Sequence, residues 1–144
     1  MKITLYTVEK ANKTILELTP RLEALVEMRA EMRRIDTRLE VMSLALAGAS
    51  PDNPDAAESR QITMERQELV TKLREGLGAI QARGCIVKDL DQGLLDFYSL
   101  MGDRLVFLCW KLGEAEIAHW HTLDGGYATR RPLDRSSTED PEGR

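Results

Sequence analysis

The sequence is poor in cysteine and in aromatic residues. It has 144 residues, of which 5% are aromatic, and only two are cysteines, Cys85 and Cys109. Two cysteines without C-x-x-C spacing do not make a disulfide framework, so we expect both thiols to be reduced and buried. No apolar run approaches the roughly 18 residues of a membrane span, and residues 1–10 lack the apolar core of a signal peptide. We therefore expect a soluble, cytoplasmic protein without a membrane partner.

The common enzyme motifs are also missing. The chain has no G-x-S-x-G elbow, no G-x-x-x-x-G-K-S/T loop, no G-x-G-x-x-G after a strand and no H-E-x-x-H. Serine-hydrolase, nucleotide-binding and zincin chemistries therefore have no support, and we assign no catalytic residue.

Clustered positive charge is lacking as well. The formal net charge is −4, and the segment 85–124 carries three basic against seven acidic residues. A surface that neutralises phosphates needs clustered Lys and Arg, so nucleic acid is not an expected partner. A metal cation or a basic protein partner fits this acidic segment better.

The first half of the chain contains two helical stripes. Apolar residues recur at steps of three and four over 8–46 and again over 62–80, as the buried face of a helix requires. Thr7 is the expected N-cap of the first helix, and Gly84 ends the second. Pro20 predicts a kink in the first helix.

The two stripes predict a helical hairpin. Folding the chain back about Pro51 gives two matched antiparallel helices over about 8–83, with coiled-coil-like packing. Asp36 then lies opposite Arg66. These two residues either form an ion pair that fixes the register or are two charges on a solvated face.

After residue 84 the apolar period changes from three or four to two, which predicts a small antiparallel β-meander over about 85–121. The expected strands are 85–89, 94–98, 105–110 and 117–121. The sequence thus predicts one α+β domain over residues 1–133, followed by a disordered tail at 134–144.

The last two strands predict an apolar interface. A tight turn at 112–115 pairs Trp110 with Ile117 and turns Phe107 and Cys109 toward the helices. The opposite face is then also apolar, and it contains the predicted interface residues Val106, Leu108, Trp110 and Ile117. An isolated antiparallel sheet normally turns one polar face to water, so we expect this face to meet a second copy, the N-terminal segment or a small ligand.

Two histidines give a candidate polar site. His119 and His121 point to the same side of one strand, an arrangement found in some metal sites. Acidic residues in the meander are candidate partners: Asp89, Asp91, Asp96, Glu114 and Glu116. The alternatives are a general acid/base pair, or ordinary surface histidines beside solvated turn carboxylates.

Several segments carry a family resemblance. They are T-V-E-K-A-N at 7–12, V-K-D-L at 87–90, L-C-W-K-L-G-E at 108–114, W-H at 120–121 and G-Y-A at 126–128. Together they resemble an uncharacterised bacterial family, domain of unknown function two-two-zero-three, which implies no activity. The motif positions that match are Asp89, Gly93, Asp96, Trp110, Gly113, Glu114, Trp120 and His121. The resemblance does not include His119, so the candidate ligand set becomes Asp89, Asp96, Glu114 and His121, with His119 and Glu116 secondary.

Three functions follow as hypotheses. The first is a non-enzymatic, homo-oligomeric interaction or binding module, in which hairpins pair into a four-helix bundle and the sheet displays an acidic surface. The alternative is a protein that binds a divalent metal (Zn, Mn, Fe or Ni), including a metal-dependent hydrolase, centred on His121 and nearby carboxylates. The third is a small-ligand binder that uses the Trp110 face.

Overall fold

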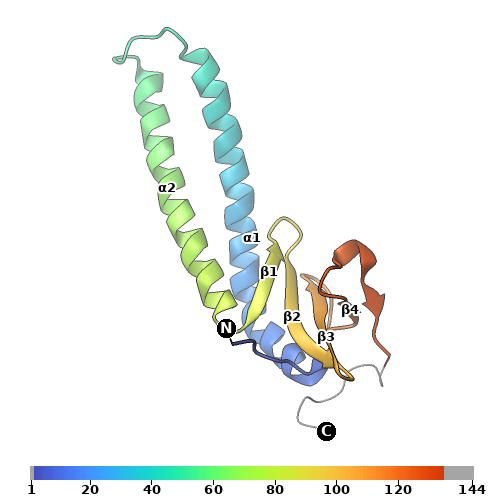
Figure 1. Cartoon of the computed structure of the whole chain (residues 1–144). Coiled ribbons are helices and arrows are strands. Elements are labelled where there is room, and N and C mark those ends of the chain that lie inside the picture. Colours follow the sequence, from blue (N-terminus) through green and yellow to red (C-terminus); the bar gives the residue numbers. More distant parts are fainter. Residues whose placement is uncertain (1, 135–144) are drawn as a thin grey trace.

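The structure is a computed structural model that describes residues 2–134. The chain forms a helical hairpin followed by a five-stranded antiparallel sheet (Figure 1), which confirms the predicted α+β class. The elements are α1 (Val8–Ala45), α2 (Pro54–Gln81), β1 (Cys85–Asp89), β2 (Leu94–Met101), β3 (Arg104–Lys111), β4 (His119–His121), the 3-10 helix η1 (Tyr127–Thr129) and β5 (Arg131–Pro132). Apart from residue 134, the predicted tail lies outside the described residues. No helix in the described part of the chain is both long and apolar enough to span a bilayer.

Helix α1 begins and bends as the sequence predicts. The Lys10 backbone N–H donates to Thr7 Oγ1 at 3.0 Å, so Thr7 is the N-cap. The helix continues through Pro20 without a break. Proline has no N–H to donate to the carbonyl oxygen four residues earlier, so the helix can bend there. Figure 1 shows the first turns of α1 below the sheet, tilted relative to the rest of the helix.

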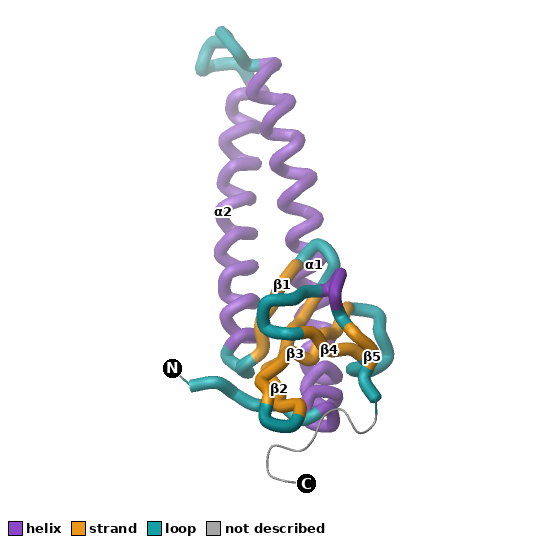
Figure 2. The backbone as a smooth tube through the Cα atoms, turned by 45° about the vertical axis from the view of Figure 1, so that its right-hand side comes forward, coloured by secondary structure: helices purple, strands orange, loops and turns teal. Residues whose placement is uncertain are grey.

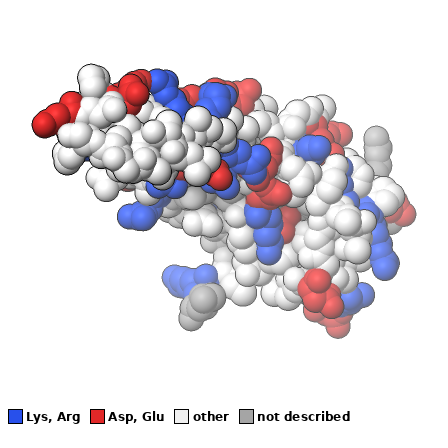
Figure 3. All heavy atoms as spheres, turned by 90° about the horizontal axis from the view of Figure 1, so that it is seen from above, with Lys and Arg blue, Asp and Glu red and all other residues white. Residues whose placement is uncertain are grey.

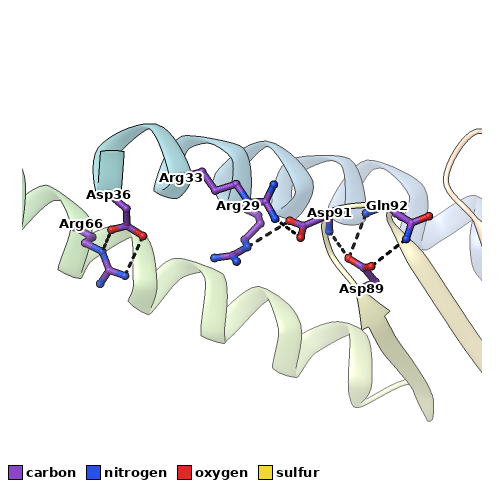
Figure 4. Close-up of polar contacts among 7 residues, drawn as sticks. All are labelled: Arg29, Arg33, Asp36, Arg66, Asp89, Asp91 and Gln92. Carbon is purple, nitrogen blue, oxygen red and sulfur yellow. Dashed lines mark hydrogen bonds and ion pairs between the residues drawn. The ribbon is translucent and has the colours of Figure 1, made fainter. Parts of the chain in front are cut away.

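The hairpin packs closely where Gly76 meets Leu25. A Cβ atom at Gly76 would lie 2.4 Å from Leu25 Cδ2, so a larger residue there would have to displace this buried leucine side chain. Across the middle of the hairpin, Arg66 Nε lies 2.5 Å from Asp36 Oδ1 (Figure 4), which confirms that these residues face one another. Both side chains are more than a third exposed, so the pair contributes little stability.

The turn between β1 and β2 is attached to α1. Asp91 in this turn forms ion pairs with Arg29 and Arg33 of the helix (Figure 4). The sheet therefore lies beside the lower half of the hairpin, while the outer half and its connecting loop extend beyond the sheet (Figure 2).

The strand order is β1-β2-β3-β4-β5, and every neighbouring pair is antiparallel. The face toward the helices, which we call the inner face, joins the single hydrophobic core. Its buried members include Cys85, Leu95, Phe97, Val106, Leu108, Trp110 and Trp120.

The predicted pairing of the last two strands was wrong by one residue. His119 lies opposite Cys109, and Trp120 lies opposite Leu108. The reason is a long connection in place of a tight turn, because the Ile117 backbone N–H donates to the Asn12 side chain of α1 at 2.7 Å and stays outside the ladder.

A shift of one residue exchanges the two faces of a strand. The predicted interface residues Val106, Leu108, Trp110 and Ile117 are consequently part of the core, and none is more than 4% exposed. The prediction of an open apolar face was therefore wrong, and Trp110 offers no open surface to a small ligand.

Candidate functional site

Three polar side chains converge on the outer face of the sheet, the face opposite the core. Asp96 of β2 lies opposite Cys109 of β3, and His121 belongs to the next strand, β4. One potential ligand atom from each lies within 4.8 Å of the others. The three residues, which we call the outer-face cluster, are each at most 2% exposed.

Both ring nitrogens of His121 are engaged. Its Nε2 lies 3.1 Å from each carboxylate oxygen of Asp96, and its Nδ1 lies 2.7 Å from the Thr122 carbonyl oxygen. A carbonyl oxygen only accepts, so Nδ1 carries a hydrogen. One proton then lies between Nε2 and the carboxylate, either on the ring or on the acid, and in both cases the pair has no net charge.

Burial determines the protonation of the cluster. It raises the pKa of the Asp96 carboxyl, an effect that nearby His121 opposes. It also raises the pKa of the Cys109 thiol to about 11, and the Asp96 carboxyl acts in the same direction. The thiol is thus protonated at neutral pH. Both cysteines are free and buried, as the sequence predicts.

These contacts do not make a nucleophilic triad. A cysteine nucleophile needs a histidine nitrogen as its base and a low thiol pKa. In the outer-face cluster, one His121 nitrogen bonds Asp96, the other bonds the Thr122 carbonyl, and the Cys109 thiol pKa is high. The cluster resembles a satisfied buried polar group or a set of metal ligands more than a hydrolytic centre.

Glu114 lies beside the cluster and is held by Arg130. The two form a bidentate pair, with Nη1–Oε1 at 3.0 Å and Nη2–Oε2 at 2.7 Å, and the Lys111 backbone N–H also donates to Glu114. Burial raises the pKa of Glu114, but Arg130 and the backbone N–H outweigh it, so the pKa is lowered overall. This pair links the segment after β4 to the β3–β4 connection.

The remaining predicted ligands do not join the cluster, although His119 lies directly opposite Cys109. Asp89 accepts the Asp91 backbone N–H at 2.8 Å and the Gln92 side chain at 3.1 Å, so it shapes the β1–β2 turn (Figure 4). Glu116 is exposed. His119 Nδ1 lies 3.8 Å from Glu114 Oε2, and no hydrogen-bond partner for this buried nitrogen is found among the described residues.

The structure therefore divides the predicted ligand set. It brings Asp96 and His121 together, gives Glu114 and Asp89 other partners, and adds Cys109, which the sequence predicts as a buried thiol without a polar role. The available signal was the L-C-W motif, and the correct strand register would have placed this cysteine beside Asp96.

Comparisons with known proteins agree with the resemblance in the sequence. The family described as "Uncharacterized conserved protein (DUF2203)" matches residues 4–133. No curated protein matches, and no solved structure does. Since the match covers nearly all of the described residues, this chain belongs to the DUF2203 family.

Proposed function

We propose that the protein is a non-enzymatic binding module that self-associates through the outer half of its helical hairpin. The supporting observation is the distribution of burial. Helix α1 has no buried residue after Ile35, and α2 has none before Ile62. Helices in proteins owe most of their stability to packing, so these outer turns require a partner that covers them.

The outer half retains apolar side chains for such a partner. Leu39, Met42 and Leu46 continue the seam between the helices but are only half-buried. Outside the seam, Val41 is 60% exposed and Leu44 is 77% exposed. A two-helix seam is open on both sides, and a second hairpin packed against it would bury these residues in a four-helix bundle.

A groove along the hairpin favours a second copy as this partner. It has a volume of about 270 Å³, and two isoleucines and four charged residues line it: Glu31, Arg34, Ile35, Arg38, Ile62 and Glu65. Figure 3 shows basic and acidic side chains interspersed along the hairpin. In a two-fold symmetric dimer the same surface of each copy meets the other. A surface with both acidic and basic side chains can then place the acidic groups of one copy against the basic groups of the other.

The outer-face cluster supports a binding role over catalysis. Its histidine has no free nitrogen to act as a base, and its thiol is protonated at neutral pH. The alternative prediction, a metal-dependent hydrolase with Asp89, Asp96, Glu114 and His121 as ligands, keeps only Asp96 and His121 of this set.

Light scattering coupled to size-exclusion chromatography tests self-association. We expect the 16.3 kDa chain to elute as a dimer or larger species, with a mass that falls on dilution. The variants Val41→Glu and Leu44→Glu should shift the equilibrium toward monomer. Leu16→Glu is the matched control, because Leu16 is 76% exposed on the same helix but outside the outer half.

A monomer at every concentration would contradict the proposal. Equal effects of Leu16→Glu and Leu44→Glu would also contradict it, since they would show that the outer half is not the contact surface.

A further inference from the structure

We propose that the outer-face cluster is a binding site for a divalent transition metal of the Zn²⁺ type. Asp96, Cys109 and His121 supply an oxygen, a sulfur and a nitrogen ligand from three adjacent strands, with the ligand atoms within 4.8 Å of one another. This set differs from the one that the sequence predicts, and the proposal does not depend on self-association.

The spacing of the ligand atoms fits a tetrahedral ion. Zinc bonds of about 2.0–2.3 Å place neighbouring ligand atoms about 3.3–3.8 Å apart. His121 Nε2 is already 3.1 Å from both Asp96 oxygens. The metal would take the place of the proton between them, and side-chain adjustments of about 1 Å would bring in the Cys109 sulfur.

The surroundings of His121 provide a second, independent observation. Metal-bound histidines usually donate their other ring N–H to a carbonyl or carboxylate, which fixes the ring and directs the free nitrogen to the metal. His121 Nδ1 has such a partner in the Thr122 carbonyl at 2.7 Å. The ring is thus held with Nε2 toward the cluster.

Charge balance favours a divalent ion in this buried place. A dication, a thiolate, a carboxylate and a neutral imidazole sum to zero, so loading leaves no net charge in the low-dielectric interior. The proton shared by Asp96 and His121 and the thiol proton of Cys109 leave to solvent. Two cations act on the ligands: Arg130, which Glu114 pairs, on the Cys109 thiol, and Lys88 on the Asp96 carboxyl, and both favour the deprotonated forms that bind a metal.

The ligand types select the class of metal. A thiolate favours Zn²⁺ and its substitute Co²⁺ over Mg²⁺ and Ca²⁺, which take oxygen ligands. Three protein ligands leave one tetrahedral position for water.

Titration of the untagged, chelator-treated full chain with Co²⁺ is the test. We expect one equivalent to bind, to produce a sulfur-to-cobalt charge-transfer absorption, and to be displaced by Zn²⁺ but not by Mg²⁺. Cys109→Ser should abolish that absorption and weaken binding by at least about tenfold. Cys85→Ser is the matched control, because Cys85 is equally buried but faces the helices.

Histidine variants give a second matched pair. His121→Gln should lose Co²⁺ binding, and His119→Gln, on the same strand but outside the cluster, should retain it. Circular dichroism establishes that each variant is folded. If Cys109→Ser does not fold, the wild type and Cys85→Ser still identify the sulfur ligand. The chain has only two thiols, so a charge-transfer absorption that persists in Cys85→Ser must come from Cys109.

Absence of stoichiometric Co²⁺ and Zn²⁺ binding in the wild type would overturn the proposal. Loss of the charge-transfer absorption in Cys85→Ser with its retention in Cys109→Ser would overturn it as well. Neither result bears on the oligomeric state, so the two proposals fail separately.

Discussion

Replacing Asp96 by asparagine or by alanine tests how much the contact between Asp96 and His121 stabilises the outer-face cluster. If His121 Nδ1 donates to the Thr122 carbonyl, Nε2 can carry a lone pair. An asparagine side chain then donates its N–H to Nε2 and preserves the contact without a shared proton. Alanine removes the partner and leaves a buried nitrogen without one.

The magnitudes follow from burial. The side chains of Asp96 and His121 are at most 2% exposed, so water does not replace a lost partner. We expect Asp96→Ala to lower the free energy of unfolding by about 2–4 kcal/mol. Asp96→Asn should lower it by less than about 1 kcal/mol. At about 3–4 °C per kcal/mol for a domain of this size, the Tm falls by about 6–16 °C for alanine and by less than about 4 °C for asparagine.

Urea denaturation at pH 7 with a chelator present, followed by circular dichroism, measures both variants against the wild type. The chelator removes any contribution of bound metal. Equal losses of stability for Asp96→Asn and Asp96→Ala would refute the inference that a hydrogen-bond partner for His121 Nε2 stabilises the fold, because an amide can replace the acid as that partner.

Three further predictions concern other parts of the molecule. Gly78→Ala should stabilise the protein by about 0.5–1 kcal/mol in thermal unfolding, since a Cβ there meets nothing within 4 Å, whereas Gly76→Ala should destabilise it by forcing the helices apart; stabilisation by both would show that the close contact is absent. Glu114→Gln should cost about 1 kcal/mol at pH 7. The folded pKa of Glu114 is lowered, so its contribution is present above the unfolded value of about 4.3 and is lost as the pH falls through the folded value; a cost of Glu114→Gln that persists at pH 2 would contradict this. Cys85 and Cys109, whose thiol pKa values are raised to about 11 by burial, should resist alkylation at pH 8 until the protein unfolds, and rapid labelling of the native protein would show that the thiols are accessible.

The helical hairpin was predictable because its information is local. Each signal for the hairpin depends only on residues close together in the sequence. These signals are the spacing of apolar residues by three and four, the Thr7 cap, and the glycine and proline cluster between the helices. The prediction that Asp36 lies opposite Arg66 followed from the antiparallel fold alone. The close contact of Gly76 with Leu25 was not predicted, because the spacing of apolar residues does not show how closely two helices approach.

The faces of the sheet were not predictable in this way. The period of two located the strands, but both faces of β3 are apolar, so the pattern did not choose between two registers one residue apart. In the structure, the Ile117 N–H donates to Asn12 of the distant helix α1 and stays outside the β3–β4 ladder, a contact that strand periodicity does not indicate.

The sequence by itself therefore determined the α+β class, the two helices, the approximate positions of β1 to β4, the family and two members of the cluster, Asp96 and His121, but it missed β5. The tertiary structure alone decided that Cys109 joins them and that Glu114 pairs with Arg130. The physical reason is that helix and strand periodicity acts between near neighbours. The contents of a sheet face depend on how each strand pairs with its neighbours and packs on distant segments, which periodicity does not encode.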